Sequence, residues 1–337
     1  MTAISDELLN PRNMRPRACN GGSGHRAPPL LLIACVTAAL TACSSGGPVA
    51  HGVPSPPSSP PPSQSSPTPV PTADLLSGCA PPLAFSSLPV IAHVPGADDL
   101  AAAPDGSLWV DDAQRTLVHV SSSGSVLQRI DDPRAPEGIV ALPDGSLLLA
   151  EQAPDRIVRL QPATMSLSVV LQLTPRTGQE GVDGIAYDPA SNMLLIPDAP
   201  NGTLLELALD GGAPTRLASG LGRPVGAATS GDGGLVVAAE DSTGLFHVAA
   251  GGAVTRVDGV TQADDVIVSG GLAYVTSLST RQLIAVDIAA GRSRILVTGD
   301  QDPQGLTRLP DGRLALSDSS AGAVVSLRGC SGSAGAG

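Results

Sequence analysis

Between Asp98 and Leu327, hydrophobic and polar positions repeat six times in the same order. Each copy opens at a short apolar run, turns, and returns as a second apolar run. The copies begin at residues 98, 137, 183, 225, 264 and 304, with spacings of 39, 46, 42, 39 and 40 residues. This is the period of a four-stranded propeller blade. The pattern therefore predicts an all-β fold, a six-bladed β-propeller.

The turns between the first two apolar runs support this assignment. Three of them read Pro104-Asp105-Gly106, Pro143-Asp144-Gly145 and Pro310-Asp311-Gly312. Asp-Gly between two apolar runs is a strong hairpin signal, because Gly supplies the positive φ that the turn requires. Two further strands follow in the first five copies, such as residues 157–160 and 168–171 in the second. One blade cannot bury its own faces, so six must stack around an axis.

The two ends of the repeat region are expected to meet. The sixth copy ends after its third strand, residues 323–327, and an unassigned strand at residues 88–94 precedes the first copy. We predict that this N-terminal strand completes the last blade and removes an open sheet edge. Cys79 lies just before that strand and Cys330 just after the last one. We therefore predict a disulfide between these two cysteines.

The region before the repeats has the features of an export signal and a spacer. Several Arg residues precede an apolar run, Leu30–Leu40, that is too short to span a bilayer. The run ends in Leu40-Thr41-Ala42-Cys43, which resembles a bacterial lipobox, in which the Cys receives lipid. The alternative is an ordinary signal peptide with an incidental Cys. We predict a signal peptide at residues 1–42 and lipid on Cys43. The protein would then be exported and anchored to the outer face of the cytoplasmic membrane.

The rest of the chain divides into three parts. Residues 43–78 are the lipidated Cys and a tether rich in Pro and Ser, a composition typical of an extended spacer. Residues 79–330 form the propeller, about 250 residues and thus one domain. Residues 331–337 form a short flexible tail.

Charge and aromatic content limit the partners. All 19 basic residues are Arg, and beyond residue 42 there are 15 Arg and 29 Asp or Glu, a formal charge of −14. This opposes nucleic acid and anionic lipid, which need clustered positive charge. The whole chain has five Phe, Tyr and Trp residues with which bases or sugars could stack. We expect a small ligand or a protein partner, no nucleic acid, membrane contact through the lipid anchor only, and a monomer.

The residues that open the copies are the candidates for chemistry. The innermost strand of each propeller blade begins at one end of the central channel, so these residues form a ring: Asp98, Glu137, Asp183, Val225, Asp264 and Gln304. Converging carboxylates either keep protons or bind a cation, and an all-oxygen ring suits Ca²⁺ or another divalent ion. The sequence thus predicts a metal site on the four acids, with Gln304 as a neutral oxygen ligand. A solvated acidic mouth is the alternative.

Two other groups of polar residues are expected to be structural. The second strands end in an outer ring on the same face: Asp112, Glu151, Asp198, Glu240, Ser277 and Asp318. Acids at such positions often cap turns or pair with an Arg of a neighbouring blade, such as Arg115, Arg156 or Arg281. His119 and His247 fall in third strands, away from the channel mouth, and we interpret both as structural.

Two stretches resemble a known superfamily. Residues 182–189 (VDGIAYDP) and 137–145 (EGIVALPDG) resemble the blade openings of the SMP-30/gluconolactonase/LRE-like propellers, and residues 147–157 are also similar to NHL repeats. In the metal-dependent lactonases of that superfamily, carboxylate and Asn side chains opening the inner strands hold one divalent cation, and an Asp assists water attack. The resemblance implies that Glu137 and Asp183 match best, with Asp98 and Asp264 in equivalent places and Asp183 as the catalytic candidate.

Two functions from different classes therefore stay open. One is a binding or scaffold module that uses its acidic channel face. The other is a divalent-metal-dependent hydrolase of lactones or similar esters. The ring has no Asn, carries Val225 where a ligand could sit, and contains no His. These departures favour binding over lactonase chemistry and disfavour the chemistry of streptogramin lyases, which some related propellers perform.

Overall fold

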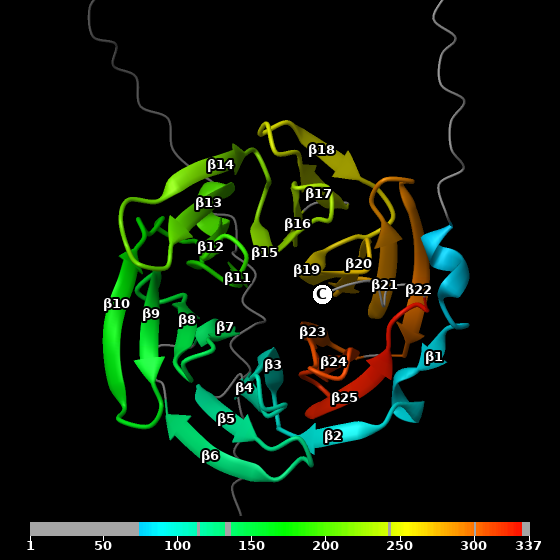
Figure 1. Cartoon of the computed structure of the whole chain (residues 1–337), viewed down its shortest axis with the longest axis horizontal. Helices are drawn as coiled ribbons and strands as arrows, with labels where there is room; N and C mark the ends of the chain where they lie inside the picture. The colour runs from blue at the N-terminus through cyan, green and yellow to red at the C-terminus, as the bar shows by residue number, and fades with distance from the viewer. Residues whose placement is uncertain (1–73, 113–114, 132–135, 242–243, 300, 332–337) are drawn as a thin grey trace, which may run out of the picture. The chain divides into compact units, whose positions relative to one another are not determined.

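Six sheets, each containing four antiparallel strands, surround a central channel (Figure 1). This is a computed structural model, which describes residues 74–112, 115–131, 136–241, 244–299 and 301–331. The predicted signal peptide, Cys43, nearly all of the tether and residues 332–337 lie outside the described residues. Within the described part, no helix has the length and apolar character that a membrane span requires. The predicted all-β, six-bladed propeller is confirmed.

Each blade contains four strands ordered from the channel outward. Blade one consists of β3 (Ala97–Ala102), β4 (Leu108–Asp112), β5 (Thr116–Val120) and β6 (Val126–Asp131). Blade two consists of β7 (Pro136–Ala141), β8 (Leu147–Glu151), β9 (Arg156–Gln161) and β10 (Ser166–Gln172). Blade three consists of β11 (Ala186–Asp188), β12 (Met193–Asp198), β13 (Thr203–Ala208) and β14 (Thr215–Ser219).

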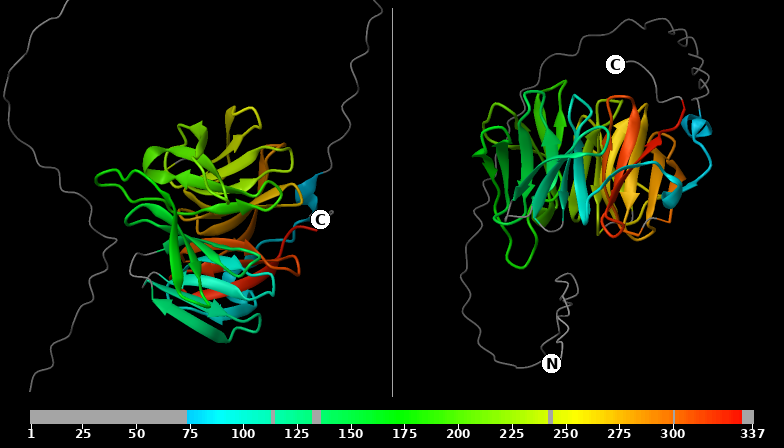
Figure 2. Two further views of the ribbon diagram at one scale, coloured as in Figure 1. Left: turned by 60° about the vertical axis from the view of Figure 1, so that its left-hand side comes forward. Right: turned by 90° about the horizontal axis from the view of Figure 1, so that it is seen from below.

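The remaining blades follow the same plan. Blade four consists of β15 (Pro224–Thr229), β16 (Leu235–Ala239), β17 (Leu245–Val248) and β18 (Val254–Val257). Blade five consists of β19 (Ala263–Ser269), β20 (Leu272–Ser277), β21 (Gln282–Asp287) and β22 (Arg292–Thr298). Blade six consists of β23 (Pro303–Arg308), β24 (Arg313–Asp318), β25 (Ala323–Arg328) and the N-terminal β2 (Val90–His93). Viewed from the side, the strands run between the two faces of the ring (Figure 2).

The ring closes as the sequence predicts. Strand β2 pairs antiparallel with β25, with Val90 opposite Val325 and His93 opposite Ala323. The two segments lie side by side in Figure 1 although they come from opposite ends of the domain. The Cys79–Cys330 disulfide is also confirmed, and it joins positions separated by 251 residues.

The N-terminal segment makes a second attachment that the sequence analysis did not predict. Strand β1 (Leu83–Ala84) pairs in parallel with the outer edge of β22, with Leu83 opposite Val297. Before it, the short helix η2 (Leu75–Gly78) buries Leu76 in the apolar cluster that contains the disulfide. The segment therefore covers one exposed edge strand of blade five before it completes blade six.

The hydrophobic core lies between the blades. The described residues form six buried apolar clusters, and each joins one blade to the next around the ring. Trp109 and Leu117 of blade one, for example, pack in one cluster with Leu149 and Val158 of blade two. Because every blade needs two neighbours to bury its faces, the closed ring is the smallest unit that buries them all.

Blade three departs from the predicted strand boundaries. The sequence predicts an inner strand that opens at Asp183, whereas β11 begins at Ala186 and has three residues. The N–H of Gly184 donates to the carbonyl of Val225 in blade four, at 2.9 Å. The segment before β11 thus bonds sideways to the next blade and not to its own second strand.

Candidate functional site

Irregular pairing at the start of the inner strands directs the ring residues toward the axis. The register between first and second strands shifts in five blades, at residues 97–100, 136–138, 224–226, 263–266 and 303–306. A β-bulge of this kind bends the strand and redirects a side chain. Each bulge contains the residue that opens the sequence repeat.

The structure brings the four predicted acids together. Asp98, Glu137, Asp183 and Asp264 line one cavity in the channel, of about 590 Å³. Gln304, the fifth predicted ligand, is buried and 7% exposed, and the wall of the cavity in its blade consists of residues 305–308.

One group of acids is close enough to share an ion. Within the described residues, ligand atoms of Asp98, Asp111 and Glu137 all lie within 4.8 Å of one another. Asp111 is 2% exposed, and its Oδ1 has no hydrogen-bond partner. Burial, together with the charges of Asp98, Asp99 and Glu137, raises the pKa of Asp111 well above its usual value. A buried acceptor of this kind is costly unless a proton or a cation compensates it.

Asp111 was missed by the sequence analysis, although the sequence carries a signal. It lies on the second strand opposite the bulge of blade one. The equivalent residues, Thr276 and Ser317, accept a bulge N–H with their hydroxyl oxygens at 2.8 and 2.9 Å. Asp111 accepts the N–H of Asp99 in the same way. The sequence signal is that Asp111 directly precedes the outer-ring residue Asp112, at a position where the other copies carry Ala, Pro, Thr or Ser.

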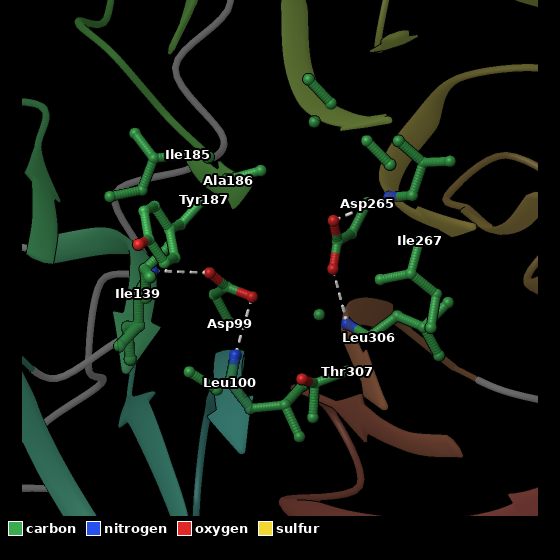
Figure 3. A pocket seen from close by; sticks show the side chains of 18 of the residues that line it. Asp99, Leu100, Ile139, Ile185, Ala186, Tyr187, Asp265, Ile267, Leu306 and Thr307 are labelled. Atoms are coloured by element: carbon green, nitrogen blue, oxygen red, sulfur yellow. Dashed lines mark hydrogen bonds between the residues drawn. The ribbon is translucent and has the colours of Figure 1, made fainter. Parts of the chain in front are cut away.

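Asp99 and Asp265 connect neighbouring blades. The Oδ1 of Asp99 accepts the N–H of Leu100 at 2.7 Å, and its Oδ2 accepts that of Ile139 in blade two at 2.8 Å. In the same way, the Oδ1 of Asp265 accepts the N–H of Val266, and its Oδ2 accepts that of Leu306 in blade six, each at 2.7 Å. Figure 3 shows both carboxylates projecting into the cavity from opposite sides. We refer to them as the bridging aspartates.

The bridging aspartates and Asp264 share an environment that disfavours charge. Burial and the charge of Asp265 raise the pKa of Asp99 well above its usual value. Burial, with a further contribution from Asp183, raises the pKa of Asp265 to about 6. The pKa of Asp264 is raised well above its usual value by burial and by Asp183, Asp98 and both bridging aspartates.

The equivalent position in the other blades is Gly. A Cβ at Gly138 would lie 2.6 Å from the carbonyl oxygen of Asp183, and one at Gly184 would lie 2.1 Å from that of Val225. Backbones of neighbouring blades therefore approach one another closely at this level of the channel. In the two blades that carry Asp at this position, the carboxylate accepts a hydrogen bond from a backbone N–H of the next blade. This bond takes the place of the close backbone contact seen at the Gly positions.

Arg223 modifies the acidic ring in a way that the sequence analysis did not foresee. Its Nη2 lies 2.7 Å from Oδ2 of Asp183 and 3.0 Å from Oε2 of Glu180, and its Nη1 pairs with Glu240. Gln152 also donates to Oδ2 of Asp183, at 3.3 Å. Asp183 is thus held in an ion pair. Arg223 precedes Val225 by two residues, in the one copy whose ring position is apolar.

The two histidines of the third strands have structural partners. The ring of His119 stacks on Trp109 with centroids 4.2 Å apart, and its Nε2 lies 2.8 Å from Oγ of Ser107. His247 pairs with Asp232 at 3.0 Å. Both histidines therefore bind the hairpin turn of their own blade, at the end opposite the acidic ring.

The outer ring is also occupied by local contacts. Asp112 accepts the N–H of Thr116 at 2.8 Å, and Asp318 accepts that of Gln301 at 2.7 Å. Glu151 pairs with Arg156 of its own blade, whereas the sequence predicts an Arg of a neighbouring blade. These contacts agree with the structural interpretation of the outer ring.

Comparison with solved structures identifies the fold. The chain is similar to a gluconolactonase from Xanthomonas campestris, with a TM-score of 0.59 and 17% identity over 70% of this chain and 86% of that one. It is also similar to an inactive virginiamycin B lyase from Staphylococcus aureus, solved with quinupristin, with a TM-score of 0.53 and 16% identity over 67% of this chain and 78% of that one. A chain of a nidogen/laminin complex matches with a TM-score of 0.55 and 20% identity over 62% of this chain and 83% of that one.

These neighbours share one architecture and differ in function. The chain has the propeller fold of gluconolactonases and streptogramin-type lyases. No family model and no curated protein matches it. A fold this widely reused does not specify an activity. The function must therefore be argued from the channel.

Proposed function

We propose that this protein binds a small ligand in its central channel with the help of a divalent cation. The cation is held by Asp98, Asp111 and Glu137, and Ca²⁺ suits these hard oxygen donors. The observation that carries this proposal is the buried Oδ1 of Asp111, which has no hydrogen-bond partner and faces two further carboxylates within 4.8 Å. A cation there replaces repulsion among three neighbouring acids, of which Asp98 and Asp111 are buried, with coordination.

The proposed ligand set revises the sequence prediction. Asp98 and Glu137 stay in it, and Asp111 joins them. Asp183 is paired with Arg223, and Asp264 is not in the carboxylate group that lies within 4.8 Å. Gln304 is buried and is not among the residues that line the cavity.

The experiment is a titration of the full chain, treated with chelator and then dialysed, with Ca²⁺, Mg²⁺ and Mn²⁺. Calorimetry and thermal melting report binding, and a bound ion should raise the melting temperature by mass action. Asp111→Asn keeps the size of the side chain and an acceptor for the N–H of Asp99. It should weaken ion binding by about tenfold or more, the effect of losing one charge-assisted contact. Asp210→Asn, at an exposed turn position, is the matched control. The proposal would be contradicted if none of the three metals changed the melting temperature of the wild type and elemental analysis found no bound ion.

A second candidate is hydrolysis of small lactones or esters. It is favoured by the position of the acid group, which borders a cavity large enough for a small organic molecule, and by the fold shared with a gluconolactonase. A cation in that position would polarise a substrate carbonyl. Asp183, the predicted catalytic residue, already accepts hydrogen bonds from Arg223 and Gln152 on Oδ2. A panel of lactones assayed before and after chelation, with wild type and Asp111→Asn, separates catalysis from binding alone.

We also propose that the protein works outside the cytoplasm, anchored through lipid on Cys43. The lipobox-like sequence and the Pro- and Ser-rich spacer support this location. A disulfide joining Cys79 to Cys330 is typical of proteins that fold in an oxidising compartment. The binding module would then reach its small ligand or protein partner at the cell surface, as a monomer.

A further inference from the structure

The cavity contains more carboxyl groups than one cation and Arg223 can pair with. Of the residues that the structure describes, seven acids line it, against a single basic residue, Arg308, in the last part of the inner strand of blade six. The proposed ion takes Asp98 and Glu137 together with Asp111, and Arg223 pairs with Asp183. Asp188 holds its own turn by accepting the N–H of Ala190 and the hydroxyl of Ser191. Asp264 and the two bridging aspartates remain.

These three carboxylates line the same cavity, and Asp264 lies near enough to the other two to interact with their charges. The bridging aspartates face it from blades one and five, on opposite sides (Figure 3). Each is fixed by two backbone N–H groups and cannot turn away without losing a contact between blades. Asp264 adjoins Asp265 on the same bulge, and the charges that act on it come from four other carboxylates. The site is therefore preorganised to receive positive charge.

The wall beside these acids is apolar. Leu100, Ile139, Ile185, Val266 and Leu306 line the same cavity, and Figure 3 shows several of them next to the bridging aspartates. A hydrated inorganic ion would leave this wall in contact with water. An organic cation can contact both the acids and the apolar side chains at once.

We propose that the channel ligand is a small amine, with its ammonium group among Asp99, Asp264 and Asp265 and a compact apolar group against the aliphatic wall. This inference rests on the proposed function only in taking the channel as the ligand site. A carboxylate ligand would be repelled, and a neutral one would not compensate the charge that these acids acquire when they ionise. The volume of about 590 Å³ suits a small molecule beside one ion. Charge-assisted hydrogen bonds supply the selectivity.

The test compares three probes of similar size that differ in charge: 2-phenylethylamine, 2-phenylethanol and 3-phenylpropionate. Each is titrated calorimetrically into the full chain, once with Ca²⁺ and once with chelator. We expect the amine to bind at least about tenfold more tightly than the alcohol, from a single charge-assisted contact, and the carboxylate more weakly than either.

Variants assign the effect to the three acids. Asp264→Asn should reduce the affinity for the amine by about tenfold and leave that for the alcohol unchanged. Asp210→Asn should change neither. Equal affinity for amine and alcohol, or an amine affinity that Asp264→Asn does not alter, would overturn the inference even if Ca²⁺ binds. Amine selectivity without any metal binding would instead support the inference and overturn the proposed ion site.

Discussion

Replacing Asp265 with Asn should change the stability of the protein in a way that reverses with pH. The substitution removes a carboxylate whose burial raises its pKa from 3.8 to about 6. It also weakens the bridge to blade six, because Asn has one acceptor oxygen where the carboxylate uses two, at 2.7 Å from Val266 N and Leu306 N. The two consequences have opposite signs, and only the first depends on pH.

The magnitude follows from the two contributions. The folded protein holds the Asp265 proton to higher pH than the unfolded chain, so the free energy of unfolding falls as pH rises from about 4 to about 7. A difference of about 2 pKa units corresponds to about 3 kcal/mol. Loss of one acceptor for a backbone N–H costs about 1–3 kcal/mol at every pH. The variant should therefore be less stable than the wild type at pH 4.5 and equally or more stable at pH 8.

Coupling to Asp99 acts in the same direction. The charge of Asp265 is one cause of the raised pKa of Asp99, so its removal lowers that pKa as well. Raising the pH should therefore lower the free energy of unfolding of the variant less than that of the wild type, and the difference should exceed the contribution of Asp265 alone.

Urea unfolding at pH 4.5, 6 and 8 measures the effect, with chelator present so that no cation compensates the acids. Trp109 is the only Trp and is buried, so its fluorescence reports unfolding. Asp210→Asn, at an exposed position, is the control and should follow the wild type at each pH. A difference between wild type and Asp265→Asn that is the same at pH 4.5 and pH 8 would refute the reasoning.

Three further predictions test the ring and its anchor. Replacing Cys330 with Ser should lower the free energy of unfolding by at most about 5 kcal/mol in the chain-entropy model, because Cys79 closes a very long loop; unchanged urea denaturation would contradict this. Gly138→Ala should destabilise the protein by about 1–3 kcal/mol, since its Cβ would lie 2.6 Å from a carbonyl oxygen of blade three. The control Gly251→Ala, with open space around it, should not destabilise. Equal melting temperatures of the two variants would argue against close contact between the blades. Cys43→Ser should leave uncleaved precursor or release soluble protein, as seen by membrane fractionation, and fractionation like the wild type would exclude a lipid anchor.

The sequence by itself was sufficient for the architecture. Blade number, hairpin positions, closure by a strand within residues 88–94 and the Cys79–Cys330 pair were all predictable, because a repeat period and Asp-Gly turns are local signals. The ring of acids at the channel mouth was predictable for the same reason. Equivalent positions in equivalent blades must converge on the axis.

What only the tertiary structure decided is the role of each acid. The sequence placed Asp99 and Asp265 beside ring positions, but their bonds reach N–H groups 40 and 41 residues away, across a contact between blades. Asp111 looks like the end of an ordinary strand until a bulge brings Asp98 and Glu137 within 4.8 Å of it. Side-chain chemistry at this site depends on how neighbouring blades are offset. That offset arises from packing of whole blades and has no local sequence signal.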